Sequence, residues 1–210
     1  MNNFFAVKDK KHTVLLVRAG LILLPLLFFL AGGAGQVQQG NFSWTMGLQN
    51  VKSGELVSFS APVQSWTGEQ FRLIISPGTD CYAYVIYEGS DGEQATVLYA
   101  GIIKSGEAWY SEILEVDANE GAESLFIVTS KNEQTALAQG IRAFASNPGT
   151  TQRRAMMNEI FRIRSEVSQY KETPEKPVLM GGAARGTPDK NQGVEFAGSP
   201  TYVKTISIEH

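Results

Sequence analysis

Cysteine and histidine are nearly missing from this 210-residue sequence, which has one cysteine and two histidines. A single cysteine excludes a disulfide within the chain and a zinc site built on several thiolates. His12 lies near the start and His210 is the last residue. A terminal residue is a poor place to preorganise an imidazole for a Ser-His-Asp or Cys-His centre. We therefore assign no catalytic residue, no metal ligand and no cofactor from the sequence.

An excess of positive charge is also lacking. The sequence has 18 Lys and Arg residues against 21 Asp and Glu residues, with a net charge of −3. The basic footprint of a nucleic-acid-binding protein is therefore missing, and no nucleic-acid partner is expected. A phosphate-binding P-loop is excluded too, because Gly186 is followed by Thr187 and Pro188 instead of lysine.

Long apolar runs are missing apart from one, at residues 19–31. Basic residues precede this run and small residues follow it, as in a secretory signal peptide. Residues 1–35 are therefore interpreted as a signal peptide, cleaved near residues 33–35, and the protein is expected in the periplasm or elsewhere in the cell envelope. The alternative is an uncleaved inner-membrane anchor, although the run is shorter than the about 20 residues of a span.

Residues 36–210 are interpreted as a single β-rich domain. Short apolar, β-branched and aromatic stretches alternate with clusters of turn-forming residues, which favours a β-sandwich or barrel. Residues 36–50 are mostly polar and are expected to form a loosely packed arm. The predicted strands cover residues 55–60, 70–76, 81–88, 96–103, 108–116, 124–130 and 201–208.

Two helices are predicted between the last two of these strands. Residues 131–146 have apolar side chains at near-helical spacing, and Asn147-Pro148-Gly149 ends the segment. A second helix, from residue 150 to about 170, has one apolar stripe of Met156, Ile160, Ile163 and Val167. The predicted fold class is mainly β, an α+β sandwich of about seven strands, with a helical insertion at about residues 131–171 before a C-terminal strand.

Several short motifs between residues 51 and 144 carry a family resemblance. They are Gly54-Glu55-Leu56 with Val57-Ser58-Phe59, the Tyr82-x-Tyr84 strand, the Asp91-Gly92 turn, and the strands at 71–73, 98–99 and 124–128. This region resembles the bacterial family named domain of unknown function 4384. Tyr99 is followed by Ala100-Gly101, where the family pattern has proline. The resemblance implies an extracytoplasmic β-rich module and transfers no catalytic residue.

Positive charge gathers in the second predicted helix. Residues 151–210 carry 9 basic and 7 acidic side chains, whereas residues 36–150 carry 5 basic and 13 acidic ones. One hypothesis is that the helix binds an anionic partner, an envelope protein or an anionic polymer. The alternative is a solvated face that also docks against the acidic body. The candidate partner-binding residues are Arg153, Arg154, Arg162 and Arg164.

Three functions stay open at this point. The first is a non-enzymatic, exported binding or scaffolding module of the bacterial cell envelope. The second is a small carboxylate-dependent hydrolase of envelope polymers, for which Glu112 with Glu115, or Asp117 with Glu120, are the candidate pairs. The third is a membrane-anchored periplasmic subunit of an envelope complex, which requires an uncleaved leader. No oligomeric state is assigned.

Overall fold

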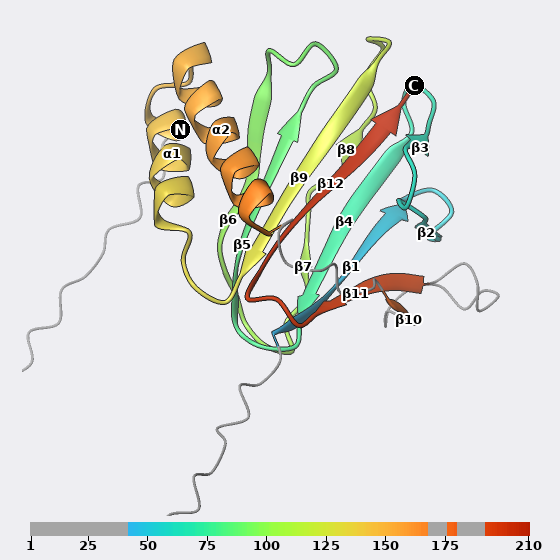
Figure 1. Ribbon diagram of the computed structural model, residues 1–210. Helices are drawn as coiled ribbons and strands as arrows, with labels where there is room; N and C mark the ends of the chain where they lie inside the picture. Colours follow the sequence, from blue (N-terminus) through green and yellow to red (C-terminus); the bar gives the residue numbers. More distant parts are fainter. Residues whose placement is uncertain (1–41, 168–175, 180–191) are drawn as a thin grey trace, which may run out of the picture. The chain divides into compact units, whose positions relative to one another are not determined.

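The computed structural model describes residues 42–167, 176–179 and 192–210 (Figure 1). The predicted leader and the glycine-rich stretch at 181–188 lie outside these residues. The described elements are β1 (Ser43–Asn50), β2 (Leu56–Val57), β3 (Val63–Gln64), β4 (Gln70–Pro77), β5 (Cys81–Glu88), β6 (Ala95–Ile103), β7 (Trp109–Tyr110), β8 (Leu114–Glu115), β9 (Ala122–Ser130), α1 (Thr135–Ser146), α2 (Thr150–Val167), β10 (Lys176–Leu179), β11 (Gln192–Ala197) and β12 (Thr201–Glu209).

The strands form two sheets. The seven-stranded sheet has the order β10-β11-β1-β4-β7, with β2 paired to β1 and β8 paired to β4. The five-stranded sheet has the order β3-β12-β9-β5-β6. The mainly β, α+β fold expected from the sequence is therefore confirmed. Five of the seven predicted strands correspond to β4, β5, β6, β9 and β12. The predicted strand at 55–60 is reduced to β2, and β1, β3, β10 and β11 were not predicted.

The main apolar core joins side chains from both sheets. Trp44, Met46 and Leu48 of the seven-stranded sheet belong to the same buried cluster as Val85 and Ile127 of the five-stranded sheet. Side chains alternate between the two faces of a strand, so one face of each sheet supplies this core. The two sheets therefore face each other as in a β-sandwich.

The expectation of a loosely packed arm is wrong for residues 43–50, and residues 36–41 of that prediction lie outside the described residues. Residues 43–50 form β1, which lies between β11 and β4 in the seven-stranded sheet. Trp44 is buried and stacks on Phe196 of β11, with ring centroids 4.4 Å apart. The apolar residues occupy alternate positions, and polar residues between them lower the mean hydropathy of the segment. The period of two, not the average polarity, is the informative signal here.

The two helices cover the outer face of the five-stranded sheet (Figure 1). Their apolar residues, among them Leu137, Met156 and Ile160, pack against Ile86 and Val128 from the other face of β5 and β9. This face explains why β5 is apolar on both sides, with Ala83 and Val85 in one core cluster and Tyr84 and Ile86 in the other. The helices do not lead directly into the final strand, because β10 and β11 intervene and join the opposite sheet.

The predicted strand at residues 108–116 is interrupted. Within this segment only β7 and β8 are strands, both paired with β4, and Ser111 lies between them. The buried Ser111 Oγ accepts a hydrogen bond from the Leu73 N–H at 2.9 Å and donates to the Glu112 carbonyl at 2.6 Å. A side-chain hydroxyl thus replaces part of the backbone ladder, which strand propensity cannot reveal.

Among the described residues, neither helix is long and apolar enough to cross a membrane.

Candidate functional site

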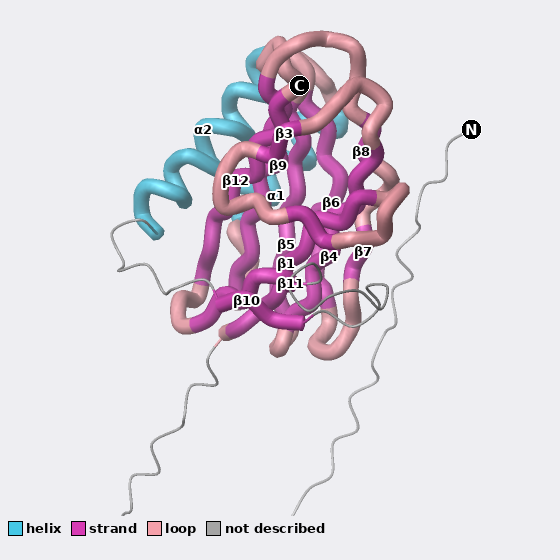
Figure 2. Tube along the Cα trace, turned by 90° about the vertical axis from the view of Figure 1, so that its right-hand side faces the viewer, coloured by secondary structure: helices cyan, strands magenta, loops and turns pink. Residues whose placement is uncertain are grey.

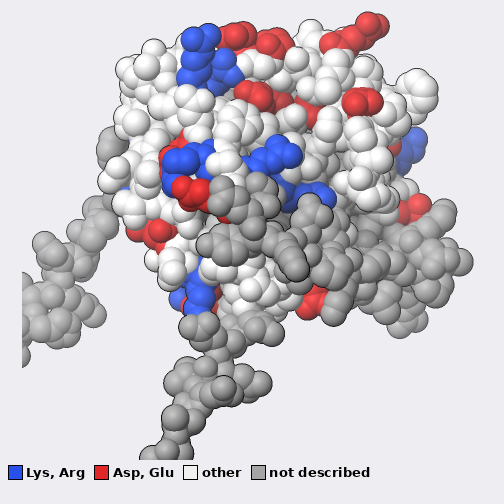
Figure 3. All heavy atoms as spheres, in the orientation of Figure 1, with Lys and Arg blue, Asp and Glu red and all other residues white. Residues whose placement is uncertain are grey.

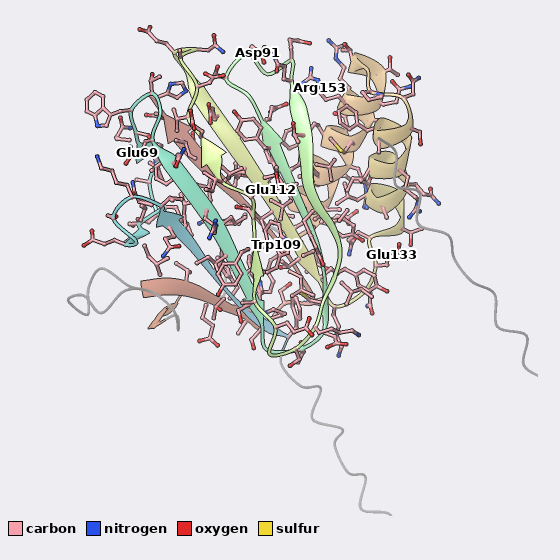
Figure 4. The ribbon with its side chains drawn as sticks, turned by 180° about the vertical axis from the view of Figure 1, so that it is seen from behind. Glu69, Asp91, Trp109, Glu112, Glu133 and Arg153 are labelled. Atoms are coloured by element: carbon pink, nitrogen blue, oxygen red, sulfur yellow. The ribbon has the colours of Figure 1, made fainter. Side chains whose placement is uncertain are left out.

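A pocket of about 310 Å³ opens between the β5–β6 hairpin and the segment around β8. Asp91 marks this hairpin in Figure 4, where Glu112 lies well away from it. Apolar and polar side chains both line it. The pocket is lined by Tyr87, Gly89, Ser90, Asp91, Gln94, Thr96, Leu98, Ile113, Leu114, Glu115, Asp117 and Asn119. Its volume lies at the small end of ligand pockets, which suits a small molecule or a single side chain.

Three carboxylates line the pocket, that of Asp91 from the β5–β6 hairpin and those of Glu115 and Asp117 from the segment around β8. The Asp91 carboxylate accepts hydrogen bonds from the Glu93 N–H at 2.8 Å and the Gln94 N–H at 3.2 Å. These bonds favour the charged form and lower the pKa of Asp91 below its usual value. Asp91 is therefore ionised at neutral pH and attracts positive charge toward the pocket.

A buried polar group lies next to the pocket, between Tyr87 of its wall and the end of β12. His210 Nε2 lies 3.5 Å from Glu123 Oε1, and their side chains are 2% and 4% exposed. Burial raises the pKa of Tyr87, and the negative charge of Glu123 raises it further. Asp117 completes the group, since one ligand atom each of Asp117, Glu123 and His210 lies within 4.8 Å of the others. Within the part of the chain that the structure describes, these three residues are the group that could hold a metal ion.

Strand pairing holds His210 in place, contrary to the expectation that a terminal imidazole is poorly organised. The His210 N–H and carbonyl both bond to Gly121, each at 3.2 Å, and continue the β12–β9 ladder. Figure 2 marks the C-terminus, where β12 ends, close to β3. Because side chains alternate, His210 shares the inner face of β12 with the buried Ile206 and Ile208.

Arg153 does not lie on the exposed face of α2. Its side chain is 9% exposed and forms ion pairs with Glu88 at 3.0 Å and with Glu93 at 3.3 Å. It also donates to the Gly92 carbonyl, and Figure 4 shows it near the hairpin that carries Asp91. Burial raises the pKa of Glu88, and Arg153 offsets only part of that effect. Arg153 therefore fixes α2 against the β5–β6 hairpin.

The other three candidate arginines are exposed at least in part. Arg162 pairs with Glu159 at 2.6 Å and also with Glu166 on the same helix. Among the residues that the structure describes, Arg154 and Arg164 have no acidic partner within ion-pair distance. Figure 3 shows blue and red atoms interspersed on the face it draws, not one continuous positive patch. The partner-binding hypothesis for α2 therefore depends on Arg154 and Arg164.

The carboxylate pairs considered from the sequence are not brought together in the pocket. Glu115 lines it and Glu112 does not, while Asp117 lines it and Glu120 does not. The structure instead places Glu115 and Asp117 on the same pocket wall. The only cysteine, Cys81, is fully buried at the start of β5, and burial raises its pKa to about 11.

Comparison of the chain with family models, curated proteins and solved structures finds no match. The resemblance of residues 51–144 to domain of unknown function 4384 therefore stays a prediction.

The Glu123–His210 pair is the feature that sequence analysis missed. The alternation that places Leu125 and Ile127 in the core also places Glu123 on that face, and the same holds for His210 after Ile206 and Ile208. The available signal was a charged or polar residue at a position where the alternation of its strand predicts a buried side chain. The residue that it faces could not be predicted, because that residue lies on another strand.

Proposed function

We infer that this chain is an exported, non-enzymatic binding module of the bacterial cell envelope, and that the acidic pocket is its ligand site. The leader pattern at residues 1–35 supports the location. One observation carries the site: the carboxylates of Asp91, Glu115 and Asp117 line one small pocket together with the apolar side chains of Leu98, Ile113 and Leu114. This combination suits a ligand with a positive charge on an apolar stem, such as an amine-bearing peptide side chain.

The pocket is favoured over the α2 arginines as the binding site. Arg153 is buried in ion pairs and Arg162 has two acidic partners on its own helix. An anionic partner would therefore meet mainly Arg154 and Arg164. The pocket offers more unneutralised charge in a smaller space, and confinement strengthens its attraction for a cation.

Calorimetric titration with trilysine tests the ligand site. We expect saturable binding to the wild-type chain, weakened about tenfold or more in the Asp91→Asn, Glu115→Gln double variant. Asparagine keeps an oxygen acceptor for the hairpin N–H groups. Trilysine acetylated on its side chains should not bind, and Glu107→Gln, an exposed acid outside the pocket lining, should leave binding unchanged. Equal binding by wild type and double variant would reject the pocket.

Intact mass of the native protein from fractionated cells tests the location. A soluble envelope protein lacking about 33 to 35 residues supports a cleaved leader. Full-length protein in the membrane fraction supports the alternative, a membrane-anchored periplasmic subunit of an envelope complex, and contradicts free export.

A carboxylate-dependent hydrolase is the second candidate, favoured by the shared pocket wall of Glu115 and Asp117. Such an enzyme needs one protonated carboxyl as general acid. The lowered pKa of Asp91 makes that residue unsuitable for the role, so the acid would have to be Glu115 or Asp117. Release of soluble fragments from purified cell wall, lost in Glu115→Gln and in Asp117→Asn, would support the hydrolase over the binding module.

A further inference from the structure

A buried carboxylate and a buried imidazole face each other at the inner edge of the pocket. Glu123 Oε1 and His210 Nε2 are 3.5 Å apart, and neither has a hydrogen-bond partner among the described residues. That separation is too long for a hydrogen bond between them. Buried polar atoms in folded proteins almost always have a partner, so this pair needs an explanation.

Three kinds of partner satisfy such a pair: a proton on the imidazole, a bridging water, or a cation between the two atoms. A proton on the imidazole would satisfy only Glu123 and His210. The structure brings a third ligand, because an Asp117 carboxylate oxygen lies within 4.8 Å of the ligand atoms of Glu123 and His210. Two carboxylate oxygens and an imidazole nitrogen that converge in this way are a donor set that a divalent transition-metal ion takes.

We propose that Asp117, Glu123 and His210 form a binding site for a divalent transition-metal ion, with Zn²⁺ as the preferred ion. Ligand atoms at about 2.1 Å from a tetrahedral zinc ion lie about 3.4 Å from one another. The Glu123–His210 separation of 3.5 Å matches this value before any movement. A nitrogen ligand beside two carboxylates favours zinc over calcium or magnesium, which take oxygen ligands.

The surroundings hold each ligand in a different way. His210 is fixed by its two backbone bonds to Gly121, and Glu123 is part of β9. Gly121 has φ +149, and a Cβ there would lie 2.8 Å from the Ser90 Cβ, so only glycine fits this junction. Asp117 is exposed, and its oxygens accept bonds from the Asn119 N–H at 2.7 Å and from Asn119 Nδ2 at 2.8 Å. Those bonds orient the carboxylate and leave it lone pairs for a metal.

The site has a route to solvent through Asp117, which belongs both to the pocket wall and to the metal cluster. Three protein ligands leave a zinc ion one coordination position for water. The metal site does not rest on the proposed function. The trilysine test changes Asp91 and Glu115, neither of which is a proposed metal ligand, so the failure of one proposal is distinguishable from the failure of the other.

Titration calorimetry with ZnCl₂ tests the site, on chain purified without a polyhistidine tag and freed of metal by chelation and dialysis. We expect one Zn²⁺ per chain with a dissociation constant of about 1 μM or below. Glu123→Gln and His210→Ala should each weaken binding about 100-fold or more, and Asp117→Asn about tenfold. His12→Gln removes the other histidine of the sequence, and Glu107→Gln removes an exposed acid; both should bind as the wild type does.

A second measurement avoids variants that fail to fold. In wild-type chain with ¹⁵N-labelled histidine, Zn²⁺ should shift the Nε2 resonance of His210 and leave that of His12 in place. Absence of zinc binding, binding unchanged in folded His210→Ala, or an unshifted His210 resonance at saturating Zn²⁺ would each overturn the site.

Discussion

Two charged clusters lie at the same end of the five-stranded sheet but on opposite faces. Glu88 ends β5 and pairs in register with Ser124, the residue after Glu123 on β9. Glu88 faces the helices and meets Arg153 of α2. Glu123 faces the sandwich interior and meets His210 of β12. The Glu123–His210 pair is the more deeply buried, with side chains 4% and 2% exposed against 19% and 9% for Glu88 and Arg153, and the two clusters also differ in charge balance.

The difference concerns where the compensating cation comes from. Arg153 reaches Glu88, Glu93 and the Gly92 carbonyl through its terminal nitrogens, so the chain supplies the positive charge itself. The Glu123–His210–Asp117 cluster has two carboxylates and no such cation among the described residues. A buried charge that the chain balances is a structural element, and one that it leaves unbalanced is a candidate for binding.

The largest effect is expected from Arg153→Met, which removes the cation from the balanced cluster. Glu88 is left partly buried without its partner, and the free energy of unfolding should fall by about 3 kcal/mol. Urea unfolding of the two chains measures this difference. Arg154→Met is the matched control, since it removes an exposed neighbouring charge and should change stability by less than about 0.5 kcal/mol. Equal losses in the two variants would show that the Arg153 ion pairs contribute little.

Cys81 extends the comparison to an ionisable group with apolar surroundings. Its pKa rises from 9.0 to about 11 on burial. Between these values the unfolded chain releases the thiol proton and the folded chain keeps it, so the wild type should lose about 2 kcal/mol of stability as pH rises from 9 to 11. Cys81→Ala should lack this component of the pH dependence, as measured by urea unfolding at each pH. Parallel curves for the two chains would mean that the thiol ionises equally in both states.

Replacing each buried glutamate by glutamine compares the two clusters directly. In metal-free protein at neutral pH, Glu88→Gln should lower the unfolding free energy by about 1 to 2 kcal/mol, because Arg153 loses a charged partner. Glu123→Gln should leave it unchanged or raise it, because a buried charge without a balancing cation is removed. Chemical denaturation measures both. A comparable loss in Glu123→Gln would indicate that the chain already balances that carboxylate.

The smallest effect is expected on the exposed face of α2. Arg154→Gln with Arg164→Gln should change the unfolding free energy by less than about 0.5 kcal/mol, because neither has an acidic partner among the described residues. The same variant tests the partner hypothesis by pull-down from envelope extracts, compared with wild-type chain. An unchanged set of captured proteins would leave these arginines without a binding role, whereas loss of a specific protein would support it.

The parts predicted correctly are those whose information is local. The strand at residues 81–88 and the stripe of α2 follow from side-chain period and β-propensity, and the structure has both. β11 was missed because its sequence, QGVEFA, includes glycine and polar residues. It is a strand because β1 pairs with it and because Phe196 stacks on Trp44. Pairing with a distant segment overrides weak local propensity.

The sequence by itself determined the β-rich class and the two helices, because these depend on composition and on periods of two and 3.6 residues. It also determined which chemistry was in short supply, with one cysteine and two histidines. Only the tertiary structure decided that Arg153 is buried against Glu88 and that Asp117, Glu123 and His210 converge. Such contacts depend on how separate strands and helices are placed against one another, and spacing along the chain does not carry that information.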